Sequence, residues 1–263
     1  MNAVESANSL DIRRIIGRRA VWELSPGGIV NLGTGIPNGV IGSELLAENA
    51  QDLVTLTIES GVYGGRPVGG IDFGIAAHPD ALIEHSYQFD FYDGHGVDVT
   101  FMGFGEVDER GNVNATKLGH LATGAGGFID ITQNAKKVVF CGTFTAQGIA
   151  VEFPSPGEFR IATEGRIRKL VKAVQQVSYS GQRGMEKDQT VLLITERAVF
   201  ALTKKGWQLN EIAPGVDLEQ DIISQMDFRP IISPTLRVMH PRIFQQGPMG
   251  LRDHLTTDKE ATN

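Results

Sequence analysis

The sequence has 263 residues, with 24 Lys and Arg against 31 Asp and Glu, a formal net charge of −7 and 41% apolar residues. This length and mixture predict a folded chain with a sizeable core, and the acidic balance argues against a nucleic-acid-binding protein. The single cysteine, Cys141, excludes an intrachain disulfide, and no apolar run is long enough to span a membrane, so an intracellular, cytoplasmic protein is expected.

The first half of the chain alternates helical and strand patterns. Residues 1–9 are expected to be a loose lead. Helical spacing begins at Asp11, with isoleucines on one face and Arg13, Arg14, Arg18 and Arg19 expected on another, and Ser25-Pro26-Gly27-Gly28 ends that helix. The patterns that follow predict a strand over 29–32, a helix capped by Asn38 and running to Ala50, a strand over 53–58, and a helix over 79–87.

The second half contains more hairpin-like patterns. Strands are predicted over 97–101 and 113–115 around a turn at 108–112, and then over 137–141, 190–194 and 198–202. A capped helix is predicted over 217–226, and a polar, frayed tail after Thr256. Together these elements predict an α/β fold: an open mixed, largely parallel sheet with flanking helices, in a single domain over 1–263 whose core spans about 11–251.

A glycine-rich loop follows the strand over 29–32 and leads into a helix. Such a loop, Gly33-Thr34-Gly35, turns backbone N–H groups toward one point, which suits a phosphate or a developing oxyanion. It does not match the dinucleotide fingerprint, because Asn38 stands where the third glycine would be. A glycine-rich turn that binds no ligand explains the spacing equally well.

A carboxylate, Glu59, ends the strand over 53–58 and is followed by Ser60 and Gly61. Ligands gather at the carboxyl ends of strands in open α/β sheets, and Gly61 lets another backbone or a thioester approach closely. Spacing alone favours a simpler interpretation, in which Glu59 accepts hydrogen bonds from nearby amides. The two strand ends together predict one crevice, where a carboxylate beside a backbone anion cradle is an acyl-transfer arrangement.

Other kinds of chemistry find little support. The histidines at 78, 85, 95 and 120 lack metal-ligand spacing, and no G-x-S-x-G segment is present. We therefore expect neither a metal site nor a serine hydrolase.

Several segments in order resemble the C-terminal, or β, half of the class I coenzyme A (CoA) transferases, from about Ile12 to Leu251. They are V-N-L-G-T-G-I-P from Val30, I-E-S-G-V-Y-G-G from Ile58, G-N-V-N-A-T-K-L-G from Gly111 and G-A-G-G-F-I-D-I from Gly124. The later segments F-C-G-T-F-T-A-Q-G and R-I-F-Q-Q-G-P-M-G-L resemble the branch that uses acetate, propionate and other short acyl-CoA substrates.

The resemblance implies a ping-pong transfer of CoA from an acyl-CoA to a carboxylic acid. Glu59 would attack the acyl-CoA, and a mixed anhydride would then be converted to a glutamyl-CoA thioester without a metal or redox cofactor. The resemblance assigns oxyanion or CoA binding to Gly33, Thr34, Gly35, Gly61, Asn114, Lys117 and Gly148. For Lys117, an exposed loop lysine without a ligand is an equally good interpretation.

The resemblance also implies a partner. The family needs an α-type half, either as a separate chain in a heteromer or fused ahead of the β half, and this sequence matches only the β half. Two alternatives remain open. One is a CoA-ester hydrolase or ring-opening hydrolase in which Glu59 is a general base on water. The other is a non-catalytic, ligand-sensing subunit.

Overall fold

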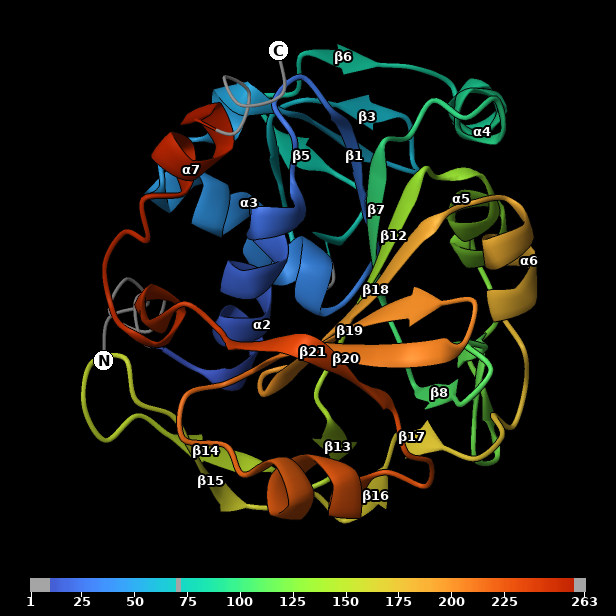
Figure 1. Cartoon of the computed structure of the whole chain (residues 1–263). Helices are drawn as coiled ribbons and strands as arrows, with labels where there is room; N and C mark the ends of the chain where they lie inside the picture. Colours follow the sequence, from blue (N-terminus) through green and yellow to red (C-terminus); the bar gives the residue numbers. More distant parts are fainter. Residues whose placement is uncertain (1–9, 70–71, 258–263) are drawn as a thin grey trace.

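The computed structural model describes residues 10–69 and 72–257 and is built around one ten-stranded mixed sheet (Figure 1). The predicted lead at 1–9 lies outside the described residues, as does the predicted tail beyond Thr257. The strands in spatial order are β21 (Ile231–Val238), β20 (Gly206–Ile212), β19 (Ala198–Thr203), β18 (Thr190–Ile194), β12 (Lys137–Cys141), β7 (Val99–Gly103), β1 (Ile29–Leu32), β2 (Thr55–Ile58), β3 (Val62–Tyr63) and β6 (Ala81–Leu82).

The five central strands, β18, β12, β7, β1 and β2, all run parallel. Their carboxyl ends therefore lie at one edge of the sheet, where Leu32 is paired with Phe101 and Cys141 with Gly103. The predicted mixed, largely parallel α/β fold is confirmed. This edge is where the loops after β1, β2 and β7 can meet.

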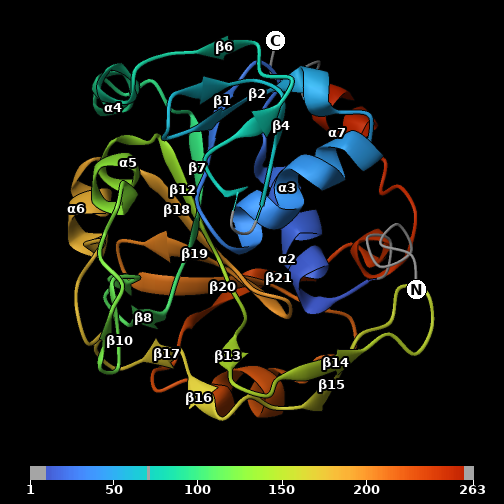
Figure 2. The same ribbon diagram turned by 180° about the vertical axis from the view of Figure 1, so that it is seen from behind.

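Helices cover both faces of the sheet (Figures 1 and 2). On one face, residues of α2 and α3 form a core with the inner side chains Val30, Phe101 and Val139. On the other, Tyr92, Phe128 and Ile131 pack with Val138 and Phe140. Burial on both faces explains why the central strands are largely apolar. Their buried polar residues Asn31 and Thr100 are hydrogen-bonded to each other at 2.8 Å. The helices are α2 (Ile12–Ala20), α3 (Ile36–Ala47), α4 (His85–Asp93), α5 (Phe128–Asn134), α6 (Gly181–Glu186) and α7 (Leu251–Thr257).

Short strands also lie outside the main sheet, in small sheets of two or three strands. They are β4 (Arg66–Pro67), β5 (Ala76–Ala77), β8 (Glu106–Asp108), β9 (Val113–Asn114), β10 (Lys117–Leu118), β11 (Leu121–Ala122), β13 (Thr145–Ala146), β14 (Ala150–Glu152), β15 (Arg160–Thr163), β16 (Ile167–Arg168) and β17 (Leu170–Val171). The hairpin of β8 and β9 carries the predicted turn, closed by the hydrogen bond from Gly111 N to Asp108 O at 3.0 Å.

The expected outward placement of the α2 arginines is wrong for two of them. Arg18 is fully buried and Arg19 is 6% exposed. Arg18 pairs with Glu44 at 3.2 Å, and Arg19 pairs with Glu211 at 2.7 Å. Buried cations require such partners, which come from distant parts of the chain.

Three helix predictions also need correction. Asn38 does not cap α3, because the helix begins at Ile36 after Gly35, with a proline in its first turn. The segment predicted as a helix over 79–87 instead forms β6, which pairs with β3, and α4 begins only at His85. The predicted helix over 217–226 is capped by Asp217 but is a π-helical turn followed by a 3₁₀ turn.

Candidate active site

A cavity of about 390 Å³ lies at the carboxyl edge of the sheet, and Glu59 lines it together with Gly33 and Thr34. The two strand ends that the sequence predicted to share a crevice are therefore brought together. The other lining residues come from the end of β7 and the segment after it, from the region after β9 that includes β10, and from the loop that leads into α5. They are Met102, Gly103, Phe104, Gly105, Ala115, Leu118 and residues 123–128.

Glu59 is the only ionisable side chain among the described residues that line this cavity. It directly follows β2, whose last residue, Ile58, is 1% exposed. Burial raises the pKa of the Glu59 carboxyl, and the nearby His85 at the start of α4 partly opposes that rise. No hydrogen bond or ion pair joins the Glu59 side chain to any residue in 10–69 or 72–257. A half-buried carboxylate without a partner is a typical feature of a reactive site.

Replacing Glu59 with glutamine should stabilise the fold at neutral pH. The pKa of Glu59 is raised in the folded state, so its contribution to stability is complete below the ordinary glutamate pKa of 4.5 and is lost as pH rises through the raised value. At pH 7 the ionised carboxylate therefore destabilises the fold, and glutamine removes that effect. We expect a higher Tm at pH 7, with the difference disappearing as the pH falls below the ordinary glutamate pKa. Thermal melts at pH 7 and below the ordinary glutamate pKa measure it, and an unchanged or lower Tm at pH 7 would contradict it.

The loop after β1 supplies fewer free amides than its sequence suggests. The N–H of Gly33 donates to Phe101 O at 2.8 Å and extends the sheet ladder, so it is not available to an oxyanion. The N–H groups of Thr34 and Gly35 have no acceptor within the part of the chain that the structure describes. Gly35 has a φ of 94°, a conformation that favours glycine, and it directly precedes α3.

Gly61 and Asn114 lie beside the cavity without lining it. A Cβ on Gly61, which has a φ of 102°, would meet Ile83 O at 2.1 Å, so glycine lets the chain after Glu59 pack against the segment before α4. Asn114 is fully buried and its amide donates to Glu106 at 2.8 Å and to Lys117 O at 2.6 Å. Its side-chain oxygen accepts hydrogen bonds from the backbone N–H groups of Thr116 and Lys117. Asn114 thereby holds the segment that places Ala115 and Leu118 in the cavity wall.

Lys117 and Gly148 are not among the residues that line the Glu59 cavity. Lys117 belongs to β10, next to the lining residue Leu118. Gly148 has a φ of 96° in the loop between β13 and β14, with open space where a Cβ would be. Their assignment to CoA binding stays a prediction.

Two lining segments were not assigned from the sequence. Gly103 ends β7 and Phe104 and Gly105 follow it, and residues 123–127 form a glycine-rich loop that leads into α5 at Phe128. The second loop carried a readable signal, since Gly124, Gly126 and Gly127 precede a helix much as Gly33 and Gly35 do. The first carried none, because Phe104 between two glycines has no distinctive pattern.

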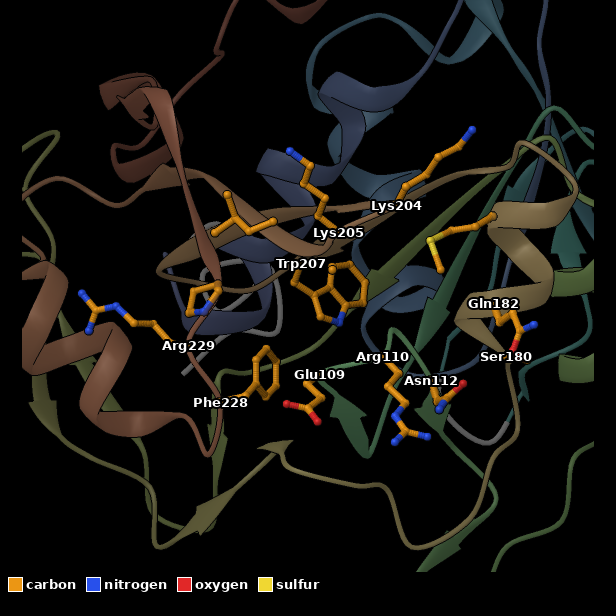
Figure 3. Close-up of a pocket in the computed structure, with 14 residues that line it drawn as sticks. Glu109, Arg110, Asn112, Ser180, Gln182, Lys204, Lys205, Trp207, Phe228 and Arg229 are labelled. Carbon is orange, nitrogen blue, oxygen red and sulfur yellow. The ribbon is translucent and has the colours of Figure 1, made fainter.

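A larger cavity, of about 570 Å³, shares no lining residue with the Glu59 cavity. It lies around Trp207 and Phe228 (Figure 3). Arg110, Lys204, Lys205 and Arg229 surround it, but in Figure 3 their charged ends point in different directions and do not converge. Its one carboxylate, Glu109, is paired with Lys172 at 2.5 Å. The arrangement provides no reactive group, so the Glu59 cavity is the better candidate.

Within residues 10–69 and 72–257, no three His, Cys, Asp or Glu side chains are grouped as metal ligands. No helix in those ranges is both long enough and apolar enough to cross a membrane.

Comparison with known proteins gives close relatives. No family model matches the sequence. The chain is 43% identical over 241 residues to the acetate CoA-transferase YdiF of Escherichia coli (strain K12), covering 92% of this chain and 45% of that protein. It is 29% identical over 225 residues to the acetate CoA-transferase subunit beta of the same organism, covering 80% of this chain and 89% of that subunit.

A solved structure agrees with these relatives. The crystal structure of the acyl-CoA transferase YdiF from E. coli O157:H7, a thioester complex with CoA, superposes with a TM-score of 0.87 at 41% identity. The match covers 92% of this chain and 46% of that one. The chain thus spans about half the length of the YdiF proteins that it matches, and most of the length of a separate beta subunit.

Proposed function

We propose that the chain is the β-type half of a class I CoA-transferase and that it carries the nucleophile, Glu59, of a CoA transfer between short acyl-CoA and carboxylate substrates. The similarity to YdiF and to the acetate CoA-transferase beta subunit supports this proposal. The observation that carries the proposal is the environment of Glu59. It is a half-buried carboxylate that forms no hydrogen bond or ion pair in the described chain, in a cavity otherwise lined by uncharged residues, with His85 partly opposing the rise in its pKa. The thioester complex of YdiF supports the same type of intermediate.

The reaction proceeds by exchange at two carbonyl carbons. A Glu59 carboxylate oxygen attacks the thioester carbonyl, the C–S bond breaks, and CoA leaves as the thiolate, which produces a mixed anhydride. The thiolate attacks the Glu59 carbonyl carbon, releases the first carboxylate and forms the glutamyl-CoA thioester. The second carboxylate reverses both steps and leaves as its CoA ester. Each step exchanges one acyl bond for another, so atoms and charge balance without a redox cofactor.

Backbone groups around the cavity support this chemistry. The free N–H group of Thr34, which lines the cavity, and that of the next residue, Gly35, lie at the start of α3 and favour negative charge on the carbonyl oxygen in the transition state. Gly61 and Asn114 place the loops on either side of Glu59. In this proposal Lys117 and Gly148 contact the CoA portion outside the cavity.

An α-type half completes the site, either as a separate chain or as a fused part. Exposed apolar side chains near the cavity support this, because water must be excluded to protect the anhydride from hydrolysis. Leu118 lines the cavity and is 43% exposed, and Leu121 on the paired strand is 63% exposed. Leu82 and Tyr87, at the segment that packs on Gly61, are also exposed. Exposed apolar groups of this kind mark interaction surfaces.

Trapping of the intermediate tests the function. We expect borohydride or hydroxylamine to inactivate the assembled enzyme after incubation with acyl-CoA, since both reagents attack a glutamyl thioester. Mass spectrometry should find the modification on the peptide that contains Glu59. Enzyme incubated with the free carboxylate alone is the control and should stay active. If acyl-CoA turnover occurs but the enzyme remains fully active after either reagent, Glu59 acts as a general base in a hydrolase and the proposal is wrong.

A further inference from the structure

Lys169 is a buried amine close to the Glu59 cavity. Its residue is 7% exposed, and its Nζ lies 3.7 Å from the centroid of the Phe104 ring. Phe104 is itself part of the cavity wall. The Lys169 amine makes no hydrogen bond or ion pair with any residue of the described chain. Burying an ammonium in this way is costly, so its retention calls for a physical reason.

The local structure holds Lys169 in this position. Val107 N donates to Lys169 O at 2.8 Å, where β17 runs parallel to β8. Gly142, after β12, leaves the necessary space. A Cβ at Gly142 would lie 2.6 Å from the Phe104 ring and 2.9 Å from Lys169 Nζ. Three separate segments therefore meet to bring the amine onto the ring.

No carboxylate of the described chain forms an ion pair that would stabilise the buried Lys169 ammonium. Burial lowers the pKa of the Lys169 amine and the charge of Glu196 partly opposes this, but the two side chains form no ion pair. Both oxygens of Glu196 already accept hydrogen bonds, from Phe144 N at 2.9 Å and from Arg197 Nε at 2.6 Å. Arg197 also pairs with Glu164 at 2.6 Å. The Lys169 ammonium instead lies over the face of Phe104, a cation–π interaction.

The proposed reactants would require positive charge near the cavity. Its described lining contains one charged side chain, the carboxylate of Glu59, and no cation. The proposed reactants, however, are carboxylates and a thiolate. Because Lys169 Nζ lies 3.7 Å from the centroid of Phe104, an anion in van der Waals contact with that ring would lie within about 8 Å of the ammonium, inside one Debye length.

We propose that Lys169 is a positioning residue for the carboxylate substrate. It holds the Phe104 ring in the cavity wall, and its charge favours anionic over uncharged occupants of the cavity. The inference rests on the proposed function, because it assumes that carboxylates enter this cavity. It extends that function by identifying a source of the preference for anions.

The pH dependence follows from the charge of Lys169. Burial lowers the pKa of the amine to about 8, and Glu196 opposes that shift. The charged groups on the neighbouring segments include Glu106 and Asp108 on β8, together with Glu164, Glu196 and Arg197. Since the ammonium is lost as pH rises through about 8, anion affinity should fall between about pH 7 and 9, whereas affinity for an uncharged analogue should not change.

The test measures binding without turnover. In the assembled enzyme carrying Glu59→Gln, calorimetry compares propionate with the uncharged propionamide. Adding Lys169→Met should weaken propionate binding about tenfold, remove its dependence on pH and leave propionamide binding unchanged. Lys169→Arg should restore most of the affinity for propionate at pH 7. Lys172→Met, a control at an exposed lysine on the same segment, should change neither ligand.

The outcomes separate this inference from the proposed function. Equal weakening of both ligands by Lys169→Met would assign it a purely structural role and overturn the inference. Unchanged propionate binding would also overturn it, as would failure of propionate to bind the enzyme with Lys169 intact. If Lys169 fails any of these tests but trapping at Glu59 succeeds, the proposed CoA transfer is still supported. A charge-dependent loss of propionate binding without trapping would leave Lys169 as part of an anion site and remove the transfer mechanism.

Discussion

Replacing Glu59 with glutamine should lower CoA transfer by about 10⁴-fold or more, with little change in the fold. Glutamine has nearly the same shape, but its neutral amide cannot attack a thioester. No other carboxylate lines the described cavity, so none is placed to substitute for it. Discharge of acyl-CoA by the assembled enzyme, followed in a single turnover, measures the loss.

Glu109→Gln provides the matched control. Glu109 lies at the turn after β8 and lines the larger cavity around Trp207, and its pairing with Lys172 is partly exposed. Exposed pairs contribute about 0–1 kcal/mol, so this variant should keep nearly all of its activity. If Glu59→Gln retained more than about a tenth of the transfer rate, or if Glu109→Gln abolished it, the wrong cavity would have been chosen.

Replacing Arg197 with methionine should lower the free energy of unfolding by about 3–5 kcal/mol. Arg197 is fully buried, and it binds Glu196 at 2.6 Å and Glu164 at 2.6 Å. Burial opposes its charge, but the two carboxylates outweigh that effect and raise its pKa. Without Arg197, Glu196 is left buried with one hydrogen bond from Phe144 N. Chemical denaturation of the variant and the parent measures the loss.

Arg229→Met is the control for that stability effect. Arg229 pairs with Glu219 at 2.7 Å, and both side chains are more than 60% exposed. Solvent screens this pair, so its removal should cost less than about 1 kcal/mol. Similar losses in the two variants would contradict the importance given to burial around Arg197.

Local patterns were sufficient for the central strands. The predictions for 29–32, 137–141 and 190–194 agree with β1, β12 and β18, because each is a short apolar run between breaking residues. The same reasoning failed at 79–87, where pairing of Ala81 with Tyr63 makes a strand of a segment that begins like a helix. Such pairing depends on residues far away in the sequence and overrides local preference.

The candidate site was likewise predicted from the sequence only in part. Glu59 and the Gly33–Gly35 loop were predicted because each follows a recognisable strand. The loss of Gly33 N–H to Phe101 O was not predictable, since it depends on the register of β1 with β7. Phe104 and Lys169 were likewise missed as parts of one site, because 65 positions separate them in the sequence.

The sequence by itself determined that a carboxylate ends one inner strand, that a glycine-rich turn ends its neighbour, and that the motifs around them resemble the CoA-transferases. These are properties of residues within a few positions of one another. Only the tertiary structure decided that the two strand ends share a cavity, that the Glu59 carboxyl has a raised pKa, and that Arg18 and Arg19 are buried with Glu44 and Glu211. The reason is physical: burial and charge depend on which distant segments pack together, whereas strand and turn patterns depend mainly on neighbouring residues.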